Sequence, residues 1–97
     1  TAITVLCDKK SKTVKGFEIR GHAGWANFGQ DIVCAGVSVL AINTQNAIER
    51  FCEDKFEQTY DEKKGLMRFV IEGLPGHDAE LLLEAGRLGF SSFSFKS

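Results

Sequence analysis

His22 and Cys34 are the two side chains whose types and setting suit nucleophilic chemistry. A cysteine thiolate attacks a carbonyl carbon, and a nearby histidine can take the thiol proton and later protonate a leaving amine. Their separation in the sequence does not establish a contact. However, the end of a strand and the start of a helix on the same sheet can lie close together. The pair therefore indicates a thiol hydrolase.

A helix start at Asp31 would favour the thiolate. Asp31 fits an N-cap, whose carboxylate accepts a hydrogen bond from a backbone N–H of the first turn. Cys34 would then be the third residue of the helix, where the dipole and unpaired N–H groups stabilise negative charge. The same N–H groups could form an oxyanion hole. Asp31 could also orient His22, and Ser38 could hydrogen-bond near the site or to its own helix.

Metal and phosphate binding are the alternatives for this stretch. Structural zinc takes ligands at short spacings such as C-x-x-C or H-x3-H, and the chain has neither. The glycine-rich loop over residues 21–30 precedes a helix start, which attracts anions. The loop matches neither G-x-x-x-x-G-K-[ST] nor G-x-G-x-x-G, and Asp31 would repel an anion. We therefore expect no metal and no cofactor.

Composition and charge exclude several classes of protein. Ninety-seven residues fit a single domain over 1–97, and 43% hydrophobic with 26% charged residues indicates a globular rather than a disordered chain. A net charge of −1 gives no basic surface for direct nucleic-acid binding. The longest uncharged run, 32–48, is too short and too polar at its end to cross a membrane. No signal peptide is visible, so we expect a cytoplasmic protein.

The remaining cysteines and the second histidine are expected to be structural. Three widely spaced cysteines suit reduced thiols better than a disulfide framework. Cys7 ends a strand pattern and Cys52 lies late in a helix pattern, so both are expected to be packing residues. His77 follows Gly-Leu-Pro-Gly and is expected to face solvent in a turn.

The hydrophobic pattern predicts two hairpins that each precede a helix. Segments 2–6 and 13–20 form the first hairpin, and 55–60 and 66–71 form the second. Gly16 interrupts the alternation of its strand and could mark a bulge. The order β-β-α-β-β-α predicts an α+β fold in which two helices pack on an antiparallel or mixed sheet.

The first predicted helix covers residues 32–54 and has no charge between Ile32 and Ile48. We expect the sheet to cover one side of it, and the second helix or another subunit to cover a further side. Asp78 is a possible N-cap for the last helix, and the tail over 90–95 alternates more like a strand. The expected buried stripes are Val33, Val37, Leu40, Ala41, Thr44, Ala47, Ile48 and Phe51, then Leu81, Leu82, Ala85, Leu88 and Gly89.

The most specific pattern is G-H-A at residues 21–23, followed by D-I-V-C-A-G-V-S at residues 31–38. It resembles the signature of the bacterial ribosomal-processing cysteine protease family. The resemblance extends over the whole chain, because the small size, the two hairpins and a Leu-rich helix opened by Leu74-Pro75 also agree. The Ser- and Phe-rich C-terminus departs from the longer, more polar helix end that the family leads us to expect.

This resemblance implies a cysteine endopeptidase with Cys34 as nucleophile and His22 as general base and acid. The family removes an N-terminal extension from ribosomal protein L27, cutting after a hydrophobic motif, and its members are homodimers. Gly21, Asp31 and Ser38 are the expected supporting or substrate-binding residues. The alternative is a non-catalytic, ribosome-associated module whose loop binds a peptide or RNA.

The family also has a mobile loop between its histidine and its cysteine. Glycines give this segment the backbone freedom of a lid that opens for an extended peptide. Trp25 and Phe28 could line a pocket for apolar side chains, or they could pin the loop to the core. The expected lid consists of Ala23, Gly24, Trp25, Ala26, Asn27, Phe28, Gly29 and Gln30.

Overall fold

The computed structural model describes residues 2–20, 28–61 and 63–92, with the backbone alone over 28–34. It confirms the predicted order of two hairpins that each precede a helix. The elements are β1 (Ala2–Cys7), β2 (Val14–Arg20), α1 (Phe28–Phe51), β3 (Phe56–Asp61), β4 (Leu66–Ile71) and α2 (His77–Ser91).

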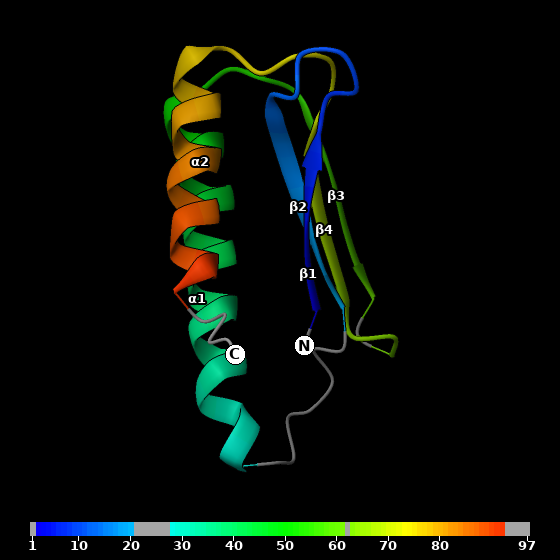
Figure 1. The fold of residues 1–97 in the computed structure, drawn as a ribbon, viewed down its shortest axis with the longest axis vertical. Helices are drawn as coiled ribbons and strands as arrows, with labels where there is room; N and C mark the ends of the chain where they lie inside the picture. Colours follow the sequence, from blue (N-terminus) through cyan, green and yellow to red (C-terminus); the bar gives the residue numbers. More distant parts are fainter. Residues whose placement is uncertain (1, 21–27, 62, 93–97) are drawn as a thin grey trace.

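The four strands form one sheet in the order β1-β2-β4-β3, and every pairing is antiparallel. The two hairpins meet through β2 and β4, where Phe17 is paired with Phe69. Both helices cover the same face of this sheet and run antiparallel to each other (Figure 1). The predicted irregularity beside Gly16 is present, because the β1–β2 register shifts between Leu6 and Cys7.

The core lies between the sheet and the two helices. Burial alternates along β4 and along the end of β2, and Phe17, Ile19 and Phe69 turn toward the helices and are buried. Three rings meet there: the centroid of Phe17 lies 5.7 Å from that of Phe69 and 5.3 Å from that of Phe90 on α2. Burial of aromatic rings in contact with one another is a large part of the stabilisation of a small domain.

The face that α2 buries differs from the predicted stripe. Leu81 and Leu88 are 60% and 72% exposed, whereas the buried residues are Ala79, Leu83, Gly86 and Phe90. Small residues determine this rotation, because a Cβ on Gly86 would lie 2.9 Å from Thr44 Oγ1 on α1. The two helices therefore approach each other at a glycine, and larger leucines at this contact would hold them apart.

The start of α2 and the end of α1 also differ from the predicted positions. The N-cap of α2 is Gly76, so Asp78 lies in the first turn rather than at the cap. The Asp54 carboxylate accepts a 2.8 Å hydrogen bond from the N–H of Gly76 itself. The helix α1 ends at Phe51 instead of residue 54, and Phe51 is 69% exposed rather than part of the buried stripe. Residues 90 and 91 continue α2, so the tail prediction was wrong there, and residues 93–97 lie outside the described chain.

Candidate active site

Strand β2 ends and helix α1 begins at the same end of the molecule (Figure 1). His22 follows the last residue of β2 by two positions and lies outside the described residues. Cys34 is within α1, where the backbone alone is described. The end of β2, which precedes the predicted base in the sequence, and the start of α1, which carries the predicted nucleophile, therefore lie at the same end of the molecule. The contact between His22 and Cys34 stays a prediction.

The start of α1 corrects the predicted role of Asp31. The helix begins at Phe28, three residues before Asp31, so Asp31 is not its N-cap. An acidic residue is favoured in the first turn as well as at the cap, and Gly29 weakens a helix without ending it. Cys34 is then the seventh residue of the helix, beyond the first turn in which the dipole acts most strongly. Its own N–H falls within the regular hydrogen-bonding pattern, so an oxyanion hole of first-turn N–H groups at Cys34 loses its basis.

Three of the residues predicted to form the lid lie in helix α1. Phe28, Gly29 and Gln30 belong to α1 and not to a loop. The other predicted lid residues, with Gly21, lie outside the described chain, so the lid and its apolar pocket stay predictions. They are Gly21, Ala23, Gly24, Trp25, Ala26 and Asn27.

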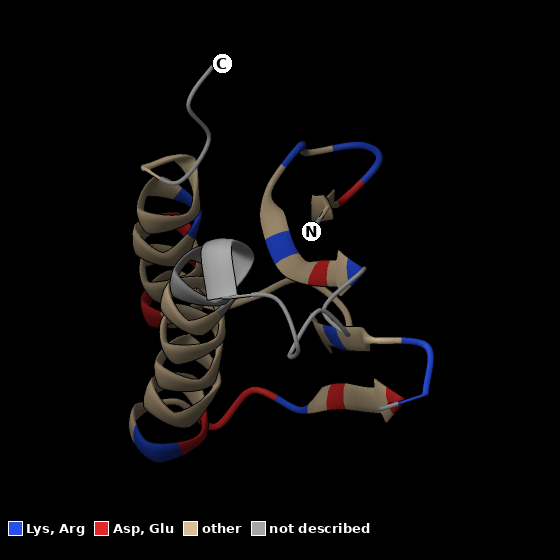
Figure 2. Cartoon of the chain, turned by 90° about the horizontal axis from the view of Figure 1, so that it is seen from below, with Lys and Arg blue, Asp and Glu red and all other residues tan. Residues whose placement is uncertain are grey.

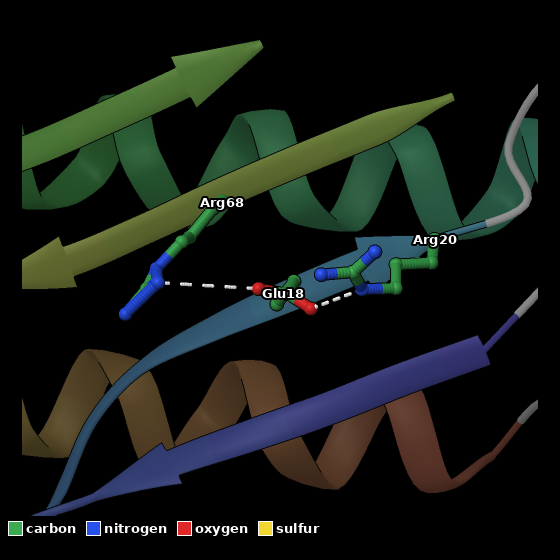
Figure 3. A network of polar contacts seen from close by, with 3 residues as sticks. All are labelled: Glu18, Arg20 and Arg68. Carbon is green, nitrogen blue, oxygen red and sulfur yellow. Dashed lines mark hydrogen bonds and ion pairs between the residues drawn. The ribbon is translucent and has the colours of Figure 1, made fainter. Parts of the chain in front are cut away.

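A polar cluster on the outer face of the sheet holds the end of β2 that leads to His22. Glu18 accepts a 2.5 Å hydrogen bond from Nε of Arg20, the last residue of the strand. The other oxygen of Glu18 lies 4.0 Å from Nη1 of Arg68 on β4 (Figure 3). The Glu18 side chain is only 15% exposed, so this contact is less screened than an ordinary surface pair. The cluster joins the end of β2 to the neighbouring strand.

Ser38 is half-buried on α1, four residues after Cys34, which places the two positions on one helix face. With Ala35 it lines one end of an open groove of about 540 Å³ between α1 and β3. Val39 and Ile42 line the groove from α1, and Phe56 lines it from β3. The groove therefore adjoins the Cys34 position on the side of α1 away from α2.

Sequence analysis did not identify this groove. It predicted that α1 would be covered on more than one side, and α2 does cover one side. Figure 2 shows the described length of α1 without charged residues until its C-terminal end. The available signal was a second stripe at helical spacing, at Ala35, Ser38, Ile42, Gln45 and Glu49, beside the core stripe.

Neither of the other thiols has the setting of a nucleophile. Burial raises the pKa of the Cys52 thiol, and the nearby carboxylates Asp54 and Asp78 raise it further. Cys7 is exposed at the end of β1, so its predicted packing role was wrong. His77 is exposed as predicted, but it begins α2 instead of lying in a turn.

No group of three or more His, Cys, Asp or Glu residues within the described ranges is arranged to hold a metal ion. Among the same residues, neither helix has the length and apolar character that crossing a membrane requires.

Residues 2–95 match the sequence model of a family described as cysteine protease Prp. The chain belongs to this family. The matched range includes both G-H-A and D-I-V-C-A, so the predicted resemblance is confirmed at the level of the family.

Two bacterial Prp proteins share parts of the sequence. The ribosomal processing cysteine protease Prp of Bacillus subtilis is 46% identical over 37 residues, which are 38% of this chain and 33% of that protein. The Staphylococcus aureus protein of the same name is 31% identical over 64 residues, which are 66% of this chain and 60% of that protein. These matches span about a third and three fifths of the relatives' own lengths.

Solved Prp structures share the fold over nearly the whole chain. The S. aureus ribosomal processing protease Prp with a substrate peptide has a TM-score of 0.82 and 25% identity, covering 95% of this chain and 88% of that chain. The same S. aureus protease with a covalently linked product peptide has a TM-score of 0.78 and 26% identity, covering 94% and 87%. The β-β-α-β-β-α arrangement is therefore the Prp fold.

Proposed function

We propose that this chain is a cysteine endopeptidase that removes the N-terminal extension of the ribosomal protein L27 precursor. The observation that carries the proposal is the family match over residues 2–95, which includes the G-H-A and D-I-V-C-A motifs. The likeness to a protease whose structure holds a covalently linked product peptide supports the covalent chemistry. We further propose that the protein acts as a homodimer in the cytoplasm.

Cys34 and His22 carry the reaction in this proposal. The Cys34 thiolate attacks the scissile carbonyl, and a tetrahedral intermediate forms. It collapses to a thioester between Sγ and the N-terminal fragment, while His22 donates its proton to the leaving amine. Water, deprotonated by His22, then attacks the thioester. Hydrolysis releases the N-terminal fragment as a carboxylate and restores Cys34.

The thiolate needs a source of stabilisation other than the first turn of α1, since Cys34 is the seventh residue of that helix. Proton transfer to His22 supplies it, because a thiolate beside an imidazolium has a depressed pKa. We assign supporting roles to Ser38, which lines the groove that adjoins Cys34, and to Asp31, which lies about two helical turns before Ser38 in α1. Gly21 and residues 23–27, which flank His22 in the sequence, are the other residues proposed to form the site.

Cleavage of synthetic peptides tests the proposal. The N-terminal segment of the host's L27 precursor is incubated with the protein, and the products are identified by mass. Wild type is expected to cut once, while Cys34→Ala and His22→Ala variants with unchanged circular dichroism are expected to lose activity. Binding of the peptide without cleavage would favour the non-catalytic module, and full activity in either variant would refute the assigned roles.

A further inference from the structure

The groove between α1 and β3 contains a buried polar atom that nothing in the described structure satisfies. Gln45 lines the groove and is 6% exposed, and its Oε1 has no hydrogen-bond partner among the described residues. Buried side-chain oxygens in folded proteins almost always accept a hydrogen bond. An acceptor of this kind is available to a ligand that donates an N–H or O–H into the groove.

The β3 strand offers further hydrogen-bonding groups along the same groove. It pairs with β4 on one side, and its other edge has no partner in the described part of the chain. An unpaired edge can accept an extended peptide as an additional strand, bound through its backbone. Phe56, Gln58 and Tyr60 alternate along β3 and face the groove. A peptide added at this edge would place alternate side chains against them.

The remaining lining consists of three apolar residues (Val39, Ile42 and Met67), the polar Asn46 and an acidic end at Glu49. Val39 and Ile42 are 67% and 47% exposed on α1, and Met67 contributes from β4. Burial of apolar side chains against these residues would supply the binding free energy. Glu49 lines the end remote from Cys34 and forms no ion pair within the described ranges. Its charge complements a basic group on a ligand in the groove.

The groove also has the length and position of a protease subsite. Ala35 directly follows Cys34 in the sequence, and the helix rises about 21 Å from Ala35 to Glu49. An extended peptide of roughly six residues covers this distance. A ligand in the groove would therefore end beside the proposed nucleophile.

We propose that this groove binds the substrate peptide as an extended segment next to the scissile bond. Its apolar side chains pack on Val39, Ile42 and Phe56, and a side-chain donor of the peptide that faces α1 donates to Gln45 Oε1. This assignment rests on the proposed protease function, which names the peptide. The occupant must contact the β3 edge and Gln45 at the same time. An extended peptide is narrow enough to do so, which favours a peptide over a second copy of the chain as the occupant.

Binding and cleavage are measured separately to test the assignment. The Cys34→Ala protein is titrated into a fluorescein-labelled octapeptide from the host's L27 precursor, and anisotropy gives the affinity. Adding Ile42→Asp is expected to weaken binding roughly tenfold or more. Adding Gln45→Leu is expected to weaken binding while thermal stability stays the same or rises, because an unpaired buried oxygen is removed. A purely structural Gln45 would not give these opposite changes.

The matched control is Leu81→Asp, which places the same charge on an exposed apolar position of α2. It is expected to bind the octapeptide as the parent does. Hydrolysis of p-nitrophenyl acetate by the Cys34-containing forms reports the thiol chemistry without needing the groove. The Ile42→Asp and Gln45→Leu proteins are expected to keep this activity and to lose cleavage of the octapeptide.

The outcomes separate this inference from the proposed function. Groove variants that bind and cleave the octapeptide as wild type does would overturn the groove assignment and leave the protease intact. Binding that depends on the groove, in a wild type that never cleaves, would support the groove and overturn the protease. A sedimentation shift to a smaller species in Ile42→Asp, with unchanged octapeptide affinity, would identify a second copy as the occupant and overturn the assignment.

Discussion

The carboxylate of Asp54 accepts a hydrogen bond of 2.8 Å from the backbone N–H of Gly76, which is the N-cap of α2. The two residues are separated by the second hairpin, so this contact joins the end of the α1 region to the start of α2. Gly76 has no side chain that could accept a hydrogen bond from a first-turn N–H, and Asp54 accepts the N–H of Gly76 itself. The negative charge also lies near the positive end of the α2 dipole.

The first prediction concerns this contact. Asp54→Ala is expected to lower the free energy of unfolding by about 1 kcal/mol, because an acceptor near the helix start is lost. Urea denaturation measures the change. Asp54→Asn keeps an acceptor oxygen and should lose less, and Glu53→Ala, at an exposed neighbouring position, should change little. An equal loss in all three variants would contradict the assigned contact.

The second prediction concerns the close approach of the two helices. Gly86→Ala adds a Cβ that would lie 2.9 Å from Thr44 Oγ1. Thr44 is buried and β-branched, and its hydroxyl donates a 2.8 Å hydrogen bond to the Leu40 carbonyl, so it cannot easily move. We expect a loss of about 1–3 kcal/mol from overpacking, which outweighs the gain of about 1 kcal/mol in helix propensity.

A double-mutant cycle with Thr44→Ala provides the control for this contact. Removing the Thr44 hydroxyl and methyl group makes room for the new Cβ, so the double variant should be more stable than the sum of the single changes predicts. Strict additivity in chemical denaturation would show that the steric contact does not determine the effect.

The third prediction concerns the titration of Cys52. Burial, with Asp54 and Asp78, raises the pKa of this thiol above its ordinary value of about 8.5. In a Cys7→Ser, Cys34→Ala background, the midpoint of the alkylation rate against pH should be higher for the folded protein than in urea. Asp54→Asn should lower the folded midpoint. Identical midpoints in the folded and unfolded protein would argue against the assigned environment.

This titration also fixes the sign of a stability change. Between the unfolded and folded pKa values, the folded chain retains a proton that the unfolded chain has lost. The contribution of Cys52 to stability is therefore complete below about pH 8.5 and is lost as the pH rises through the folded pKa. Denaturation of the same background between pH 7 and 10 should show this decline, and a Cys52→Ala variant should not show the same part of it.

The strands and their order could be predicted because alternation is a local signal. Phe17, Ile19, Met67 and Phe69 are all buried, at alternate positions of β2 and β4. Helix boundaries were less certain from sequence, since an aspartate is favoured at the N-cap and also in the first turn. Asp31 and Asp78 illustrate this ambiguity, because both lie inside helices that begin earlier.

Faces that depend on contacts between elements could not be predicted from spacing alone. The choice of Leu83 over Leu81 for burial depends on Gly86 meeting Thr44, which no local pattern of α2 contains. Helix α1 has no charge between Ile32 and Ile48, so its sequence does not show which side of the helix packs on the core. The motif around His22 and Cys34 led directly to the family, whereas the groove became visible only when β3 was placed beside α1.

Detection of a thioester on Cys34 by mass spectrometry is the most direct test of the proposed function. The protein is mixed briefly with an L27 precursor peptide, quenched in acid and measured as an intact chain by mass spectrometry. We predict an added mass equal to the N-terminal fragment less one water, located on the tryptic peptide that contains Cys34 and absent from Cys34→Ala. Cleavage of the peptide at the wild-type rate by Cys34→Ala, without any adduct on the wild-type chain, would contradict the account.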